Sequence, residues 1–383
     1  MTTPRRPLPR SLAPLPEESL PGYLLRLAHR LGQSPDQTAQ LCGLPSRPPA
    51  GLAARNLVAL PNETAAMLAA ATRLSPAEAH GLTLRQFAAA YPPLTPAIPM
   101  ATTAGQHGSS WMLHNWVLDR EGRYCPDCLA GDTSPIQQAL GGPWKLRWHL
   151  PITLACTIHR RLLNAVCPAC GNTPGGPVGL IREPSIRGLH PTQCRACLET
   201  AQHREHRQLC AARLDQAPST TTPIPDTDLH SALVLQQRLD HLFATDPRTA
   251  RGYVLDLVTA SQLIAITWPA CSAFAPTATA EALIDTHAMS RPGKPRAGSL
   301  QIRPWSAPRD PAHRAALLLA AEALIQDCGH DPAASQNLIH RYVRGLSLAR
   351  FQRHSQPLHA DSALANALTR PTPDTPPPSP RAL

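Results

Sequence analysis

Apolar residues in the first quarter of the chain recur at helical spacing. Five of them lie three or four residues apart and so share one helix face: Leu20, Tyr23, Leu24, Leu27 and Leu31. Ser19 can cap the start of this helix, and Gly32 suits the left-handed position after its last turn. Ser34, followed by Pro35 and by Gln37 three residues on, opens a second short helix. Two short helices joined by a Gly-containing turn make a helix-turn-helix candidate.

A second helical pair is predicted further on. Asn62 can cap a helix that runs to Thr72, and the segment Ser75–Glu78 has the pattern of a capping box. Helical hairpins of this kind also fill many all-α domains that never touch DNA. If this domain does contact DNA, four cations are available to it: Arg47, Arg55, Arg73 and Arg85.

The remaining pattern alternates between linkers and helices. The aromatic and apolar tract 144–154 is typical of a strand that runs into Cys156. Leucines predict helices within 229–242 and 254–258, an Ala/Leu-rich helix covers about 312–328, and a last helix falls near 338–348. After Cys197, a basic helix is expected at 201–213, with Arg204 and Arg207 as further candidate DNA contacts.

The predicted fold is mainly α with small β. It has an N-terminal helical helix-turn-helix domain and a C-terminal helical region. Between them, four closely spaced pairs of cysteine or histidine are typical of a double zinc-ribbon region. The expected boundaries are a disordered 1–16, a helical domain at 17–90, a linker at 91–108, the zinc-ribbon region at 109–213, the helical region at 228–350 and a disordered Pro-rich tail at 356–383.

The candidate chemistry lies in four ligand pairs, each with two residues between its members. They are Cys125 and Cys128, Cys156 and His159, Cys167 and Cys170, and Cys194 and Cys197. Zinc prefers four tetrahedral sulfur or nitrogen ligands, so each pair is half a site and the eight residues predict two structural Zn²⁺ sites. Sequential pairing gives one Cys₃His site and one Cys₄ site. An interleaved arrangement, first pair with third and second with fourth, is also open.

Disulfides are the alternative use for so many cysteines. No apolar run near the N-terminus resembles a signal peptide, so a reducing bacterial cytosol is expected, where paired cysteines more often bind metal. Cys42, Cys210, Cys271 and Cys328 stand alone and are interpreted as small buried residues or bystanders. No run is long enough to span a membrane, so a soluble protein is expected.

The formal charge of the chain is +10, which two loaded zinc sites would reduce to about +7. A basic chain attracts nucleic acid through counterion release, although ordinary surface charge has the same composition. The sequence contains no phosphate-binding Gly-x-x-x-x-Gly-Lys-Ser/Thr loop, no His-Glu-x-x-His motif and no Gly-rich dinucleotide turn. We therefore expect a protein that is not an enzyme.

Four segments carry a family resemblance. They run from Glu18 to Ala28, from Tyr124 to Leu129, from Trp148 to His159, and from Arg161 to Gly171. In order and spacing the chain resembles the TniQ family over about residues 15–215. Proline at position 21 departs from the bulkier residue expected there.

The resemblance implies a non-enzymatic adaptor of transposition. Such proteins mark a DNA target and recruit an AAA+ ATPase of the TniB/TnsC type, which recruits a DDE transposase. Some bind a DNA site directly; others dock on an RNA-guided complex and form homodimers. A nucleoid-associated, cytoplasmic location follows. The resemblance also places the first zinc site at Cys125, Cys128, Cys156 and His159 and the second at Cys167, Cys170, Cys194 and Cys197. The alternative is a zinc-containing helix-turn-helix transcriptional regulator.

Overall fold

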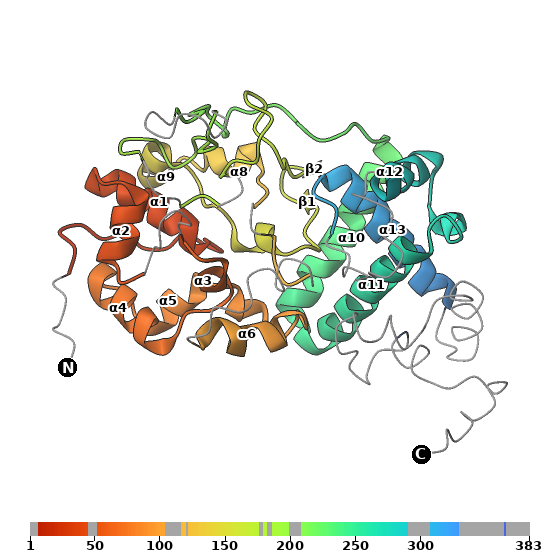
Figure 1. Ribbon diagram of the computed structural model, residues 1–383, viewed down its shortest axis with the longest axis horizontal. Helices are drawn as coiled ribbons and strands as arrows, with labels where there is room; N and C mark the ends of the chain where they lie inside the picture. Colours follow the sequence, from red (N-terminus) through yellow and green to blue (C-terminus); the bar gives the residue numbers. More distant parts are fainter. Residues whose placement is uncertain are drawn as a thin grey trace, which may run out of the picture.

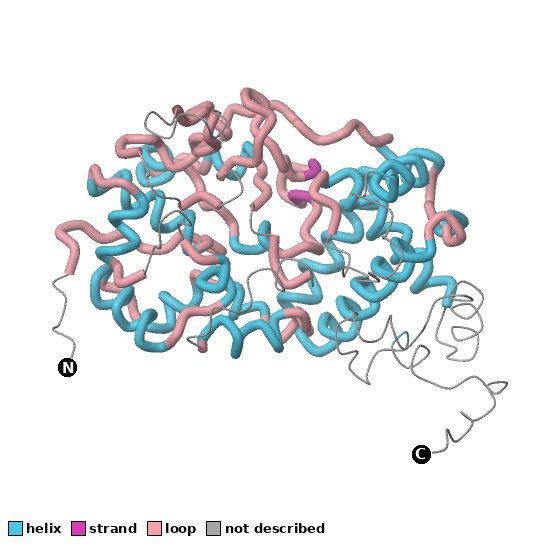
Figure 2. The backbone as a smooth tube through the Cα atoms, in the orientation of Figure 1, coloured by secondary structure: helices cyan, strands magenta, loops and turns pink. Residues whose placement is uncertain are grey.

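The protein is mainly helical with very little sheet, as the hydrophobic pattern predicts (Figures 1 and 2). The computed structural model describes residues 7–44, 52–103, 116–119, 122–175, 179–181, 186–198, 208–289, 307–328 and 364. Within these residues no helix is long and apolar enough to cross a membrane.

The N-terminal helices are short. They are α1 (Leu20–Leu31), α2 (Pro35–Leu41), α3 (Ala54–Val58), α4 (Asn62–Thr72), α5 (Pro76–Gly81), the 3₁₀ helix η1 (Leu84–Phe87) and α6 (Leu94–Thr102). The cap expected at Asn62 is wrong, because Asn62 is the first helical residue of α4 and Pro61 holds the cap position. Other caps are as predicted. The Ser19 hydroxyl accepts a hydrogen bond from Gly22 N, Gly32 has a φ of 63°, and Ser75 forms its capping box with Glu78. Ser34 makes no side-chain cap bond. Helix α1 packs on α2, and α4 packs on α5.

Helix α6 lies where a linker over 91–108 was expected. Its buried residues Leu94, Ala97 and Ala101 lie three or four apart, which is the spacing of a core-facing helix. Pro96 is in the first turn, where backbone N–H groups have no partner within the helix, so it costs no hydrogen bond there. The proline content led to the linker prediction, although the spacing of the apolar residues favours a helix here.

The central region consists mostly of turns. It contains α8 (Pro126–Ala130), α9 (Pro135–Leu140), the 3₁₀ helix η2 (Leu146–His149) and the antiparallel strands β1 (Ala155–Cys156) and β2 (Arg161–Leu162). The expectation of a strand at 144–154 is wrong, because this tract forms η2 and turns. Its carbonyl groups at Trp148 and Leu150 accept hydrogen bonds from Arg123 Nη2 at 3.2 and 2.7 Å, so a side chain replaces the neighbouring strand.

Four long helices form the C-terminal part: α10 (Asp226–Thr245), α11 (Pro247–Thr267), α12 (Ala278–Met289) and α13 (Pro311–Cys328), with a 3₁₀ turn η4 (Ser272–Phe274). Helix α13 packs against the other three, at the opposite end of the molecule from α1 and α2 (Figure 1). Helix α12 lies between the helices that the leucine pattern predicts, in the Pro-, Thr- and Gly-rich stretch 269–310. The helix predicted at 338–348 and the tail at 356–383 lie outside the described residues, except for Leu364, which is buried.

The hydrophobic cores do not follow the expected domain boundaries. One core joins α1, α2, α4 and α5 to the cysteine-rich region through Tyr124, Trp144 and Trp148. The other joins α3 and α6 to η2, β1 and the C-terminal helices. Gly22 is needed at the first junction because a Cβ there would lie 2.7 Å from Trp144 Cβ. The N-terminal helices therefore share their cores with the rest of the chain.

Residues 7–16, expected to be disordered, lie against the N-terminal helices. Leu8 and Leu12 are buried, Leu8 N donates to Ala71 O at 2.8 Å, and the Tyr23 hydroxyl donates to Leu12 O at 3.1 Å. Residues four apart lie on the same side of an extended chain, so Leu8 and Leu12 can both pack on the N-terminal helices without forming a helix themselves.

A buried ion pair is present at each end of the molecule. Glu18 and Arg26 form two bonds of 2.6 and 2.7 Å with less than 2% of either side chain exposed. At the other end, Arg314 of α13 is fully buried and pairs with Asp119, which also accepts from Arg123 at 2.7 Å. Arg314 Nη1 also donates to Pro151 O at 2.9 Å, so the pair fastens α13 to the central region.

Candidate metal centres

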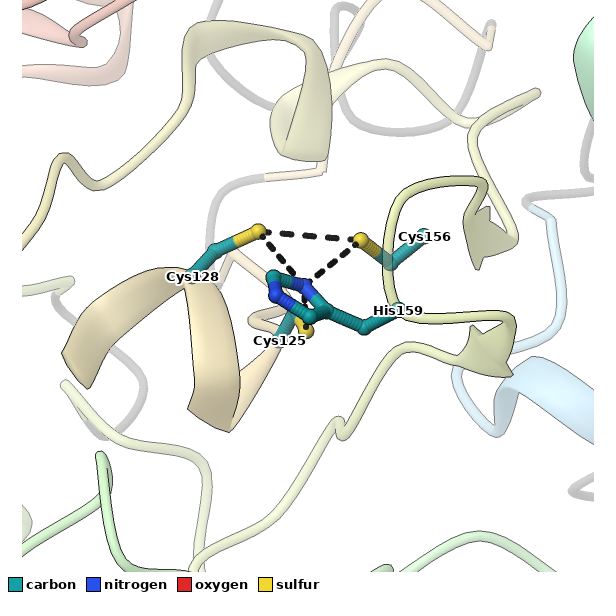
Figure 3. A group of neighbouring side chains, drawn as sticks. All are labelled: Cys125, Cys128, Cys156 and His159. Atoms are coloured by element: carbon teal, nitrogen blue, oxygen red, sulfur yellow. Dashed lines mark hydrogen bonds between the residues drawn. The ribbon is translucent and has the colours of Figure 1, made fainter. Parts of the chain in front are cut away.

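The first centre combines the first two sequence pairs. Cys125 precedes α8 and Cys128 lies within it, while Cys156 is in β1 and His159 is in the turn between β1 and β2 (Figure 3). Strand pairing of Cys156 with Arg161 closes that turn and directs the Cys156 and His159 side chains toward α8. The first and second pairs therefore come together, as sequential pairing predicts.

The donor atoms of this centre are spaced as a tetrahedral metal requires. His159 Nδ1 lies 3.4, 3.3 and 3.4 Å from the sulfur atoms of Cys125, Cys128 and Cys156, and the last two sulfur atoms are 3.6 Å apart. With Zn–S near 2.3 Å and Zn–N near 2.1 Å, a tetrahedron places S and N about 3.6 Å apart and two S atoms about 3.8 Å apart. These four residues could hold one metal ion.

The three thiols are buried and influence one another, whereas His159 is exposed. Hydrogen bonds with Cys125 and Cys128 lower the pKa of Cys156, and hydrogen bonds with Cys125 and Cys156 raise the pKa of Cys128. Arg161, which pairs with Asp127 at 3.0 Å beside the centre, adds a positive charge there.

The second centre differs from the prediction in one ligand. Four thiols come within 4.8 Å of one another: Cys167, Cys170, Cys194 and Cys210. The sulfur atoms of Cys167 and Cys210 are 3.8 Å apart, and those of Cys170 and Cys194 are 3.9 Å apart, close to the tetrahedral spacing of about 3.8 Å. Burial raises the pKa of Cys194, and it raises that of Cys210 to about 11.

Cys197 was expected in this centre, but the structure places Cys210 there instead. Segment 193–198 is not a turn and runs antiparallel to segment 208–213. Side chains alternate along extended chain, so residues three apart, such as Cys194 and Cys197, point to opposite faces. Cys210 is on the opposing segment, where it can face the same side as Cys194.

This pairing also corrects the expectation of a helix over 201–213 for its described part, 208–213. The sequence does not indicate Cys210 as a ligand, because no cysteine or histidine lies near it with two residues between them. A ribbon that contributes one ligand from each strand leaves no Cys-x-x-Cys pattern. The other single cysteines, Cys42, Cys271 and Cys328, are buried, as expected for small core residues.

Three of the six predicted DNA-contacting arginines lie among the described residues. Arg73 is exposed and adopts the left-handed cap position after α4, Arg85 is exposed in η1, and Arg55 is half-buried. The other three candidates lie outside the described residues: Arg47, Arg204 and Arg207.

The molecule is thus a helical protein with two four-ligand clusters of a kind that holds metal in closed structural sites. The sequence model of the TniQ family matches residues 9–163. This segment belongs to the TniQ family, which confirms the family that the sequence motifs indicated, and it links the chain to transposition. The match includes the first centre, whereas the second lies beyond it. No curated protein and no solved structure matches the chain significantly.

Proposed function

We propose that the protein is a non-enzymatic target-selection adaptor of transposition. In this role it binds DNA, a targeting complex or both, and recruits an AAA+ ATPase and through it a DDE transposase. The observation that carries the proposal is the TniQ match over residues 9–163, which includes helices α1 to α6 and the first metal centre.

Both centres are proposed to bind Zn²⁺ in a structural role. One Cys₃His and one Cys₄ donor set suit zinc, and four protein ligands leave no open position for a catalytic water. The ligands proposed are Cys125, Cys128, Cys156 and His159 for the first ion, and Cys167, Cys170, Cys194 and Cys210 for the second. When bound, the metal supplies cross-links between loops that have little regular secondary structure of their own.

Rigid loops serve an adaptor because a recruiter must present fixed surfaces to more than one partner. The first centre ties α8 to the β1–β2 hairpin, and α10 packs on both strands. A hydrogen bond of 2.9 Å from Leu154 N to Gln236 of α10 continues the same connection. The first centre therefore lies at the C-terminal end of the TniQ segment and adjoins α10, so loss of its metal would loosen the contact between the two parts.

The experiment is a pull-down with the immobilised protein and its cognate AAA+ ATPase, with and without duplex DNA. An adaptor retains the ATPase, and retention is lost in a variant of the first centre such as Cys156→Ser. Failure of the wild-type protein to retain the ATPase, with or without DNA, would overturn the adaptor role.

The alternative is a helix-turn-helix transcriptional regulator that contains zinc. A regulator would bind a palindromic DNA site tightly without any ATPase. Selection from a random-sequence DNA library with the protein alone separates the two. Enrichment of a palindrome, together with no ATPase retention, favours the regulator.

A further inference from the structure

Three exposed arginines gather around α1 and α2 from segments far apart in the sequence. Arg30 is in the last turn of α1, Arg10 precedes that helix, and Arg187 lies between Cys170 and Cys194 of the second centre. Arg10 Nη1 donates to the backbone carbonyl of Arg30 at 3.2 Å, and Arg187 Nη2 donates to Gln37 Oε1 of α2 at 3.1 Å. We call these residues the three-arginine surface.

None of these three arginines forms an ion pair with another described residue. Seven other described arginines do pair with carboxylates: Arg26, Arg123, Arg147, Arg161, Arg213, Arg238 and Arg314. On the three-arginine surface, Arg10 is instead held at the end of α1 by a backbone carbonyl group, and Arg187 is held at α2 by the amide oxygen of Gln37. Such an arrangement is favourable when an anionic partner supplies the opposite charge.

The segment that carries Arg187 is firmly held on α1. The carbonyl of Leu189 accepts from Arg195 at 3.3 Å and lies 3.2 Å from His29 Nδ1 of α1, while Trp144 Nε1 donates to Pro191 O at 3.0 Å. Arg195 is itself buried next to Cys194 in the second centre. The second centre thus helps to fix the position of Arg187 relative to α1 and α2.

The chemistry of the surface fits the backbone of a DNA duplex. Helix α2 follows α1 through the turn at Gly32, the order of a helix-turn-helix, and presents the exposed Gln37. Arginines beside such a helix can bind the phosphates that border a groove. The aliphatic side chains of Leu41 and Ile186, 49% and 44% exposed, can contact sugars or thymine methyl groups.

We infer that the three-arginine surface contacts the phosphate backbone of double-stranded DNA. This inference rests on the proposed DNA contact of the adaptor and assigns that contact to α1, α2 and Arg187, rather than to Arg73 after α4 and Arg85 in η1. Each phosphate contact contributes about 0.9 to the slope of log K against log salt concentration, so three contacts contribute about 2.7.

The test compares two variants of equal charge by fluorescence anisotropy with a labelled random-sequence duplex over a series of salt concentrations. The test variant combines three substitutions: Arg10→Ala, Arg30→Ala and Arg187→Ala. The control removes three other exposed arginines: Arg73→Ala, Arg85→Ala and Arg248→Ala. All six side chains are exposed, and unchanged metal content and melting temperature verify that both variants fold.

The test variant should bind more weakly and lose up to about 2.7 from the salt slope, whereas the control should lose much less. An unchanged slope in the test variant, or an equal loss in the control, overturns the assignment and leaves the adaptor role intact. If the wild-type protein binds no duplex, the surface does not contact DNA, and an acidic protein partner becomes the better match. ATPase retention then still tests the adaptor role separately.

Discussion

Glu18 and Arg26 form a buried ion pair, but loss of the Glu18 carboxylate should destabilise the protein much more than loss of the Arg26 guanidinium. Arg26 is 1% exposed, its Nη1 atom has no partner among the described residues, and its remaining bonds go to Glu18 and to Ala13 O. Replacing Glu18 with leucine leaves a buried guanidinium that has no counter-ion and cannot lose its charge. Removing one partner of a buried pair costs about 3–5 kcal/mol, and we expect Glu18→Leu to fall in this range.

Arg26→Met should cost less than Glu18→Leu. Burial raises the pKa of Glu18, and the loss of Arg26 raises it further, so the carboxyl group can become neutral by taking up a proton. The double variant, which combines Glu18→Leu with Arg26→Met, introduces two apolar side chains into an apolar site, and such exchanges are often neutral or stabilising by about 1–4 kcal/mol. The double variant should therefore be more stable than Glu18→Leu alone.

Equilibrium urea denaturation of the metal-loaded protein measures all three variants, with tryptophan fluorescence as the probe because Trp144 packs beside α1. Arg238→Gln is the control, since that side chain is 50% exposed and its ion pair should contribute only about 0–1 kcal/mol. A cost for Glu18→Leu below about 1 kcal/mol, or a double variant less stable than either single one, would refute this reasoning.

Two further predictions concern the second centre and His149. Wild-type protein and Cys197→Ser should each carry about two zinc ions by mass spectrometry of the native protein, whereas Cys210→Ser should carry about one; the reverse result would restore Cys197 as the ligand. His149 donates its Nδ1–H to Asp119 O at 2.8 Å, and burial lowers its pKa in the folded protein. As the pH falls below about 6.5, the usual pKa of histidine, the unfolded chain therefore takes up a proton on His149 before the folded protein does. Stability should therefore decrease from about pH 6.5 downward, and His149→Gln should reduce this decrease in urea midpoints; an identical pH dependence in both proteins would contradict the assignment.

Local signals in the sequence predicted local structure well. Ser19, Gly32 and the capping box at Ser75 fix helix ends through contacts with residues a few positions away, and the structure has each of them. The same holds for the first metal centre, because turns of two intervening residues determine how Cys125 and Cys128, and then Cys156 and His159, face one ion.

Features that depend on distant contacts were not predicted. Cys210 enters the second centre because its segment pairs with the segment of Cys194, and the tract 144–154 is not a strand because Arg123 takes its carbonyl groups. Neither interaction leaves a periodic pattern in the chain. Helix α6 was missed for a different reason, since its prolines outweighed a visible apolar spacing.

The two shared cores limit where this protein can be divided. The family match stops at residue 163, yet Leu180, Ile181 and Leu214 are buried in the same cluster as the side chains of α1, and α13 is buried against residues 116–118. A fragment cut at that residue would expose leucine-rich faces to water on both sides and would tend to aggregate. Exchange of the TniQ segment between relatives would therefore have to carry the contacting surfaces of the later segments along with it.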